Sequence, residues 1–159
     1  MKRLLVGIAA AVLGLALAAG LASAAGRPGS PGAAEYKCSG ADVTVFDNYN
    51  GGAVSGGGTS PSFTTKGKAY CLVWIQTYHY NNGKGTRPGK LGLTGTTTVK
   101  LRKASKAPGE NWIVNFSTTK PVVIHGRYSC NDSSPKTWSQ DSQSKGKGFC
   151  YVEGVSAKK

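Results

Sequence analysis

The sequence predicts an all-β fold, a single antiparallel β-sandwich of jelly-roll type with two disulfide bonds. Short stretches of Val, Thr, Ile and aromatic residues recur between clusters of Gly, Asn, Ser and Pro. Apolar residues in these stretches alternate with a period of two, and no segment shows the 3.6-residue period of an amphipathic helix. Four cysteines follow an apolar N-terminal segment. Together these observations indicate a small exported β domain.

The N-terminal 24 residues have the organisation of a secretory signal peptide. Lys2 and Arg3 precede an apolar run over residues 4–19, and the segment ends with the A-x-A pattern of residues 22–24. The alternative is a retained membrane anchor, but the run is rich in Ala and Gly and only weakly apolar. We therefore expect cleavage after residue 24 and secretion into the extracellular or periplasmic space.

Residues 25–34 are predicted to be a Gly/Pro/Ala linker, and residues 35–159 the β-sandwich domain. The expected cleavage leaves one domain with a modest core. It also removes Lys2 and Arg3, so the net charge falls from +13 to +11. Such a charge favours a partner with a negative surface, such as an anionic cell-envelope or extracellular polymer; the alternative is that it serves solubility alone.

The cysteine spacing predicts two disulfide bonds and leaves the pairing open. The cysteines are Cys38, Cys71, Cys130 and Cys150, an even number at wide spacing in a chain expected to be exported. Three pairings are possible. Zinc sites usually draw their ligands from close pairs such as C-x-x-C, and this chain has none. We therefore expect neither a metal site nor a cofactor.

The predicted strands are short and separated by turn residues. Residues 70–80 are the clearest, because apolar side chains fall on both faces, as in a central strand. In residues 96–102, Val99 and Leu101 share one face and basic residues the other, which predicts one solvent-exposed face. The other predicted strands are residues 43–46, 62–65, 112–116, 122–124, 127–130 and 149–155. Residues 81–90 and 131–147 are expected to be long polar loops.

Two segments carry recognisable motifs. Residues 77–93 match T-Y-H-x-N-x-G-x-G-x-x-P-G, and residues 126–148 match G-x-Y-x-x-x-D-S-x-x-x-T-W-S. The pair resembles a recurrent extracellular domain of secreted bacterial and archaeal proteins, a β-sandwich without a settled function. The resemblance implies a binding or adhesion module. Asp141, where that domain usually has Asn, and the four cysteines depart from its pattern.

The same two segments supply the candidate ligand-binding residues. Flat aromatic rings beside hydrogen-bonding groups are how a shallow site binds an amphipathic ligand such as a sugar. The candidates are Tyr78, His79, Asn81, Asn82, Asp132, Ser133 and Trp138. The alternative is architectural: these residues shape two long loops or pack in the core. The leading hypothesis is a secreted, non-enzymatic binding module for a cell-envelope or extracellular polysaccharide.

No catalytic set is evident, and we name no catalytic residue. The chain lacks a G-x-S-x-G elbow, and its thiols are expected to be oxidised. The alternative is a small nuclease-like hydrolase that uses His79 and His125 as acid and base. A third possibility is a structural surface domain without a specific ligand. Nucleic-acid binding is not favoured, because neither a basic helix nor an aromatic-rich RNA-binding motif is present.

Overall fold

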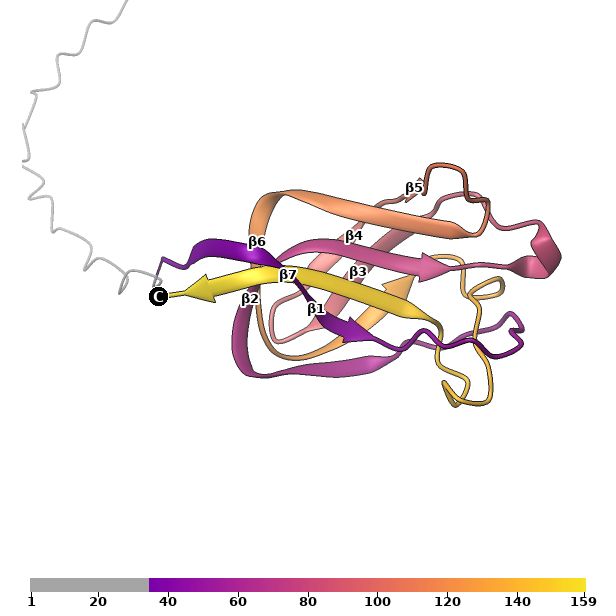
Figure 1. Cartoon of the computed structure of the whole chain (residues 1–159), viewed down its shortest axis with the longest axis horizontal. Coiled ribbons are helices and arrows are strands. Elements are labelled where there is room, and N and C mark those ends of the chain that lie inside the picture. The colour runs from indigo at the N-terminus through magenta and orange to yellow at the C-terminus, as the bar shows by residue number, and fades with distance from the viewer. Residues whose placement is uncertain (1–34) are drawn as a thin grey trace, which may run out of the picture. The chain divides into compact units, whose positions relative to one another are not determined.

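The computed structural model describes residues 35–159, apart from the side chains of residues 117–120, and confirms the antiparallel β-sandwich (Figure 1). The predicted signal peptide and linker lie outside the described residues. The strands are β1 (Lys37–Asp47), β2 (Ser62–Tyr78), β3 (Lys90–Gly95), β4 (Val99–Lys103), β5 (Ser105–Lys106), β6 (Ile113–Asp132) and β7 (Cys150–Lys158). A short 3-10 helix, η1 (Asn81–Gly83), follows β2. Within the described residues, no helix is long and apolar enough to cross a membrane.

One antiparallel sheet in the order β1-β7-β2-β6-β3-β4 supplies both layers of the sandwich, with β5 paired to β6. One layer contains β1, β7, the second part of β2 and the first part of β6. The other contains the start of β2, the end of β6, β3 and β4. β2 and β6 therefore pass through both layers.

The predicted breaks inside β2 and β6 are bends of continuous strands. In β2, the ladder to β6 shifts between Thr64 and Ala69, where Lys66 and Gly67 have φ of 50° and 77°. In β6, Gly126 has a φ of 108°, and a Cβ there would overlap Thr96 Oγ1. Turn-forming residues within a strand produce a bulge that bends it. The prediction of several separate short strands was wrong in these two places.

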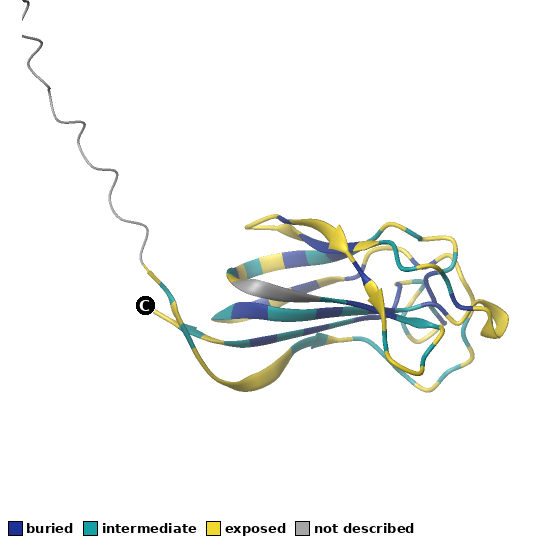
Figure 2. Ribbon diagram, turned by 90° about the horizontal axis from the view of Figure 1, so that it is seen from above, coloured by how far each residue is buried: buried dark blue, intermediate teal, exposed yellow. Residues whose placement is uncertain are grey.

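The core lies between the two layers, and buried positions alternate with exposed ones along the central strands (Figure 2). Ile75, Leu91 and Leu93 are fully buried. Leu91 and Leu93 belong to β3, which the sequence analysis did not predict because glycines interrupt its apolar residues. Val99 is buried as predicted, but Leu101 is 45% exposed, because β4 is an edge strand whose ladder to β3 is irregular.

The disulfide pairing is Cys38–Cys71 and Cys130–Cys150, and none of the four thiols is free. The first bond joins edge strand β1 to β2. The second joins β6, where it pairs with β3, to the start of β7, and so links the two layers. Cys130 and Cys150 are both fully buried. Two such bonds indicate an oxidising, extracellular type of environment.

Replacing Cys130 and Cys150 together by Ala is expected to lower the free energy of unfolding by about 3 kcal/mol, the value for closing a loop of this length. The measurement is urea denaturation of the oxidised protein. The comparison is the Cys38→Ala/Cys71→Ala pair, which leaves the layers linked. An unchanged denaturation midpoint for the Cys130/Cys150 variant would show that this bond does not stabilise the fold.

Candidate functional site

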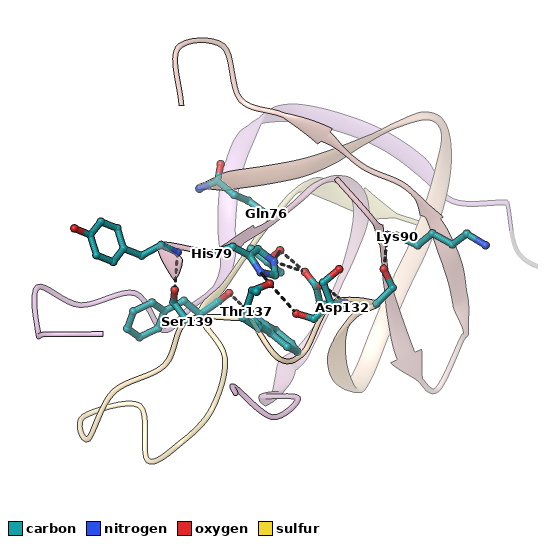
Figure 3. A network of polar contacts seen from close by, with 12 residues as sticks. Gln76, His79, Lys90, Asp132, Thr137 and Ser139 are labelled. Carbon is teal, nitrogen blue, oxygen red and sulfur yellow. Dashed lines mark hydrogen bonds and ion pairs between the residues drawn. The ribbon is translucent and has the colours of Figure 1, made fainter. Parts of the chain in front are cut away.

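The histidine of the first motif and the aspartate of the second meet inside the protein (Figure 3). His79 Nε2 lies 2.8 Å from Asp132 Oδ2, and their side chains are 0% and 2% exposed. Thr77 Oγ1 donates to the same carboxylate oxygen at 2.6 Å. The Ser134 backbone N–H donates to Asp132 Oδ1 at 2.6 Å. The carboxylate, at the last residue of β6, is therefore held from the end of β2 and from the loop that follows β6.

Thr137 completes a hydroxyl–imidazole–carboxylate row. Its Oγ1 lies 2.9 Å from His79 Nδ1 and donates to the Ser134 carbonyl at 3.2 Å. This arrangement resembles the order of groups in a hydrolase triad, in which the hydroxyl must face the substrate. Here the imidazole is fully enclosed, and both its nitrogens are within hydrogen-bonding distance of protein groups. The row therefore fixes the loop after β6 to the end of β2.

Trp138 lies in the core rather than on the loop surface. It is 1% exposed, and its Nε1–H donates to the Phe149 carbonyl at 2.8 Å. A Cβ at Gly148 would overlap the indole. The adjacent Ser139 accepts the Tyr80 backbone N–H with its Oγ, and its own N–H donates to the Tyr78 carbonyl. The T-W-S motif thus packs against the end of β2, and Trp138 is not available to a ligand.

The two asparagines of the first motif differ in their contacts. Both have left-handed backbone, with φ of 45° at Asn81 and 54° at Asn82. Asn81 Nδ2 donates to the Gly85 carbonyl, which closes the loop on itself. Asn82 is exposed at the loop tip, and its side chain makes no hydrogen bond to another described residue. Of the two, only Asn82 presents a free amide to solvent.

Ser133 contacts the backbone of the other motif loop. It is an exposed residue, and its Oγ accepts the Lys90 backbone N–H at 2.8 Å. Its own N–H donates to the Lys90 carbonyl at 3.1 Å. These two bonds join the end of β6 to the start of β3. The structure thus brings His79, Asp132 and Ser133 together as the framework of the two motif loops.

A cleft of about 400 Å³ lies beside this framework, at the same end of the sandwich. Tyr78 and Tyr80 from the first motif line it, and Tyr80 is 40% exposed. The sequence analysis did not identify the remaining lining residues. They are Tyr49, Asn50, Gly51, Gly52, Ala53, Val54 and Phe149. The feature of the sequence that could have identified them is an aromatic residue, Tyr49, within the turn-like segment of residues 47–52.

The aromatic rings of the cleft contact one another. The Tyr49 ring stacks on Phe149 with centroids 5.4 Å apart, and Tyr78 lies 6.1 Å from Tyr49. The Tyr80 ring meets the edge of Trp112 at 6.0 Å. Burial raises the pKa of the Tyr49 phenol above its ordinary range, and burial, followed by Tyr80 and Glu110, raises that of Tyr78. Both phenols are therefore neutral hydrogen-bonding groups at neutral pH.

Asp141 holds the polar wall of the cleft. Its Oδ1 accepts the Asn50 amide N–H at 3.1 Å and the Ser144 backbone N–H at 2.8 Å. Asn50 Oδ1 in turn accepts the Gly52 backbone N–H. A Cβ at Gly52 would overlap Asp141 Oδ2, so only glycine allows this close approach. Burial on its own raises the pKa of the Asp141 carboxyl, but hydrogen bonds from Ser144 and Asn50 outweigh it and lower the pKa.

The two histidines are far apart. His125 is exposed and pairs in register with Ala69, near the start of the second part of β2. His79 directly follows the other end of that strand. At roughly 3.3 Å per residue, the two positions are separated by about 30 Å. An acid–base pair must reach one reacting group, so this geometry gives the two-histidine mechanism no support.

Among the described residues, no group of three or more His, Cys, Asp or Glu side chains is placed to hold a metal ion. Comparisons with protein-family models, curated protein sequences and solved structures found no match to this chain. The resemblance carried by the two motifs therefore stays a prediction, and the geometry of the cleft and its framework bears the functional argument.

Replacing Asp132 by Ala is expected to lower the free energy of unfolding by about 3–5 kcal/mol, because it leaves three buried donors without their acceptor. Urea denaturation measures the change. Asp42→Ala, which removes a carboxylate at an exposed position of β1, is the matched control. Equal stability of the two variants would show that the His79–Asp132 network does not hold the fold.

The lowered pKa of Asp141 predicts a loss of stability in acid. A carboxyl whose pKa is lower in the folded than in the unfolded state stabilises the fold above the unfolded value, about 4. This contribution is lost as the pH falls through the folded value. Melting temperatures between pH 6 and pH 3 should therefore fall less steeply for Asp141→Asn than for the parent. Parallel curves would contradict the assignment.

Proposed function

We propose that the protein is a non-enzymatic, secreted binding module, and that the cleft formed by Tyr49–Val54, Tyr78, Tyr80 and Phe149 binds a cell-envelope or extracellular polysaccharide. The observation that carries the proposal is the aromatic surface of this cleft beside the Asn50 amide and the Gly51–Gly52 backbone. Aromatic faces pack on the apolar face of a sugar ring, while amide and peptide groups bind its hydroxyls.

The rigidity of the surroundings supports the proposal. Tyr78 and Tyr80 flank His79, which the network fixes from three sides. The Asn50–Gly52 wall is fixed to Asp141. A site whose walls are already ordered loses little conformational entropy when a ligand binds. The cleft is therefore suited to bind an extended polymer that supplies few contacts for each sugar unit.

The oxidised cysteines agree with an extracellular place of action. Both disulfides lie in the described domain, and one links its two layers. Secretion would follow from the signal peptide predicted in residues 1–24. The structural alternative, a surface domain without a specific ligand, needs no ordered cleft with a partly exposed ring. Tyr80, 40% exposed at the cleft, favours binding over this alternative.

Tyr80→Ala is expected to weaken polysaccharide binding about ten-fold, the effect of truncating an aromatic hot-spot residue. The purified chain is tested by pull-down on cell-wall preparations and insoluble polysaccharides at moderate salt, which suppresses attraction based on charge. Tyr36→Ala, an aromatic truncation at the opposite end of the domain, is the control. Retention of the parent on none of the materials, or equal retention of both variants, would reject the proposal.

A further inference from the structure

A second hollow surface lies at the other end of the sandwich. Two adjoining grooves of about 510 and 210 Å³ share Thr44, Lys68 and Tyr70. Strands β1, β2 and β7 supply their walls, and the lining includes Lys66 and Lys158 but no acidic residue. Ala69, in the groove, and Tyr78, in the aromatic cleft, are about 30 Å apart along β2. The grooves are therefore separate from the cleft.

The lysines of these grooves form no ion pair with another described residue, although Glu153 lies opposite the groove residue Thr44 in the ladder between β1 and β7. Among the described residues, the only ion pair is His79–Asp132, so Lys66, Lys68 and Lys158 have no carboxylate partner. Lys37 on β1 lies directly opposite Lys158 on β7 in the ladder. Like charges at directly opposed positions of an antiparallel pair destabilise it. An anion bound from outside would relieve this repulsion.

The backbone at Lys66, which lines the smaller groove, is unusual for a lysine. Lys66 has a φ of 50°, and the next residue, Gly67, has a φ of 77°. A non-glycine residue in this left-handed region is strained, and glycine or asparagine would fit there with less strain. Strained positions of this kind concentrate at functional sites. The bulge of β2 thus places a lysine where the backbone favours glycine.

The neutral groups of the grooves indicate the class of anion. Hydroxyl side chains of Thr44, Thr64, Ser156 and Tyr70 lie among the lysines. These groups match the hydroxyls of a sugar chain. Tyr70 is half-buried, so the grooves offer no exposed aromatic platform on which nucleobases could stack. Lysine supplies compact point charges, which suit separate sulfate or carboxylate groups along a chain.

We infer that the grooves bounded by Lys66, Lys68 and Lys158 bind a linear polysaccharide that carries sulfate or carboxylate groups. The inference does not depend on the aromatic cleft. Under this inference, part of the basic charge of the chain lies in a groove and binds a ligand. A charge that served solubility alone would not need to lie in a groove. The inference also gives the domain two binding surfaces, one at the bend of β2 and one at its C-terminal end.

The test uses the full chain and a size-defined heparin fragment, with binding measured by titration calorimetry at several salt concentrations. Lys66→Gly should leave the melting temperature equal or higher, because glycine suits the left-handed backbone, and should weaken binding about five-fold. Lys66→Gly/Lys68→Ser should weaken it by about 25-fold. The matched control is Lys100→Ser/Lys103→Ser, which removes the same charge from edge strand β4.

Equal weakening by the two double variants would overturn the inference, because the attraction would then depend on net charge alone. Binding of single-stranded DNA by the parent as tight as that of heparin would overturn the assignment to a polysaccharide. Tyr80→Ala should leave heparin binding unchanged. The proposals for the aromatic cleft and for the basic grooves can therefore be rejected independently. Retention on neutral polysaccharides tests only the cleft, and the lysine variants test only the grooves.

Discussion

The hydrogen bonds to the Asp132 carboxylate are the interaction that fixes the end of the molecule with the two motif loops. The carboxylate accepts hydrogen bonds from the hydroxyl of Thr77, the imidazole of His79 and the backbone of Ser134. These donors belong to the end of β2 and to the loop after β6. A buried charge is tolerated only when its hydrogen-bonding capacity is met. Because three donors meet it here, two loops from distant parts of the sequence have one fixed arrangement.

The fixed arrangement of the two loops divides the residues of the first motif into two groups, those in the buried polar network and those that line the cleft. In the first motif, inward-pointing Thr77 and His79 alternate along the chain with Tyr78 and Tyr80, which line the cleft. Alternation is the natural consequence of an extended backbone, whose successive side chains point to opposite faces. The polar network therefore holds the aromatic rings in place from inside the protein, where the His79 and Asp132 side chains are 0% and 2% exposed. The cleft and the network therefore lie on opposite faces of the chain at the end of β2.

The two ends of the sandwich differ in their chemistry. The end with the motif loops carries the aromatic cleft and the buried Asp132 and Asp141. The end where β1 begins and β7 ends carries lysines that form no ion pair within the described part of the chain. β2 runs the length of the domain and contributes to both. Its bulge at Lys66–Gly67 bends it between the layers and also forms part of the basic groove. The same bulge therefore shapes the sandwich and contributes a lysine to its surface.

The sequence by itself determined the β class and the oxidation of the four cysteines, and it singled out the two motif segments that the structure brings together. These follow from local properties: residue alternation, turn composition and the apolar N-terminal segment that predicts export. It did not determine which cysteines pair, that Trp138 belongs to the core, or that Tyr49 and Phe149 join Tyr78, because each depends on which strands become neighbours. Nor did it show that Lys66–Gly67 bends a strand instead of ending it. Only the tertiary structure decided these points, since contacts between residues distant in the chain have no local signature.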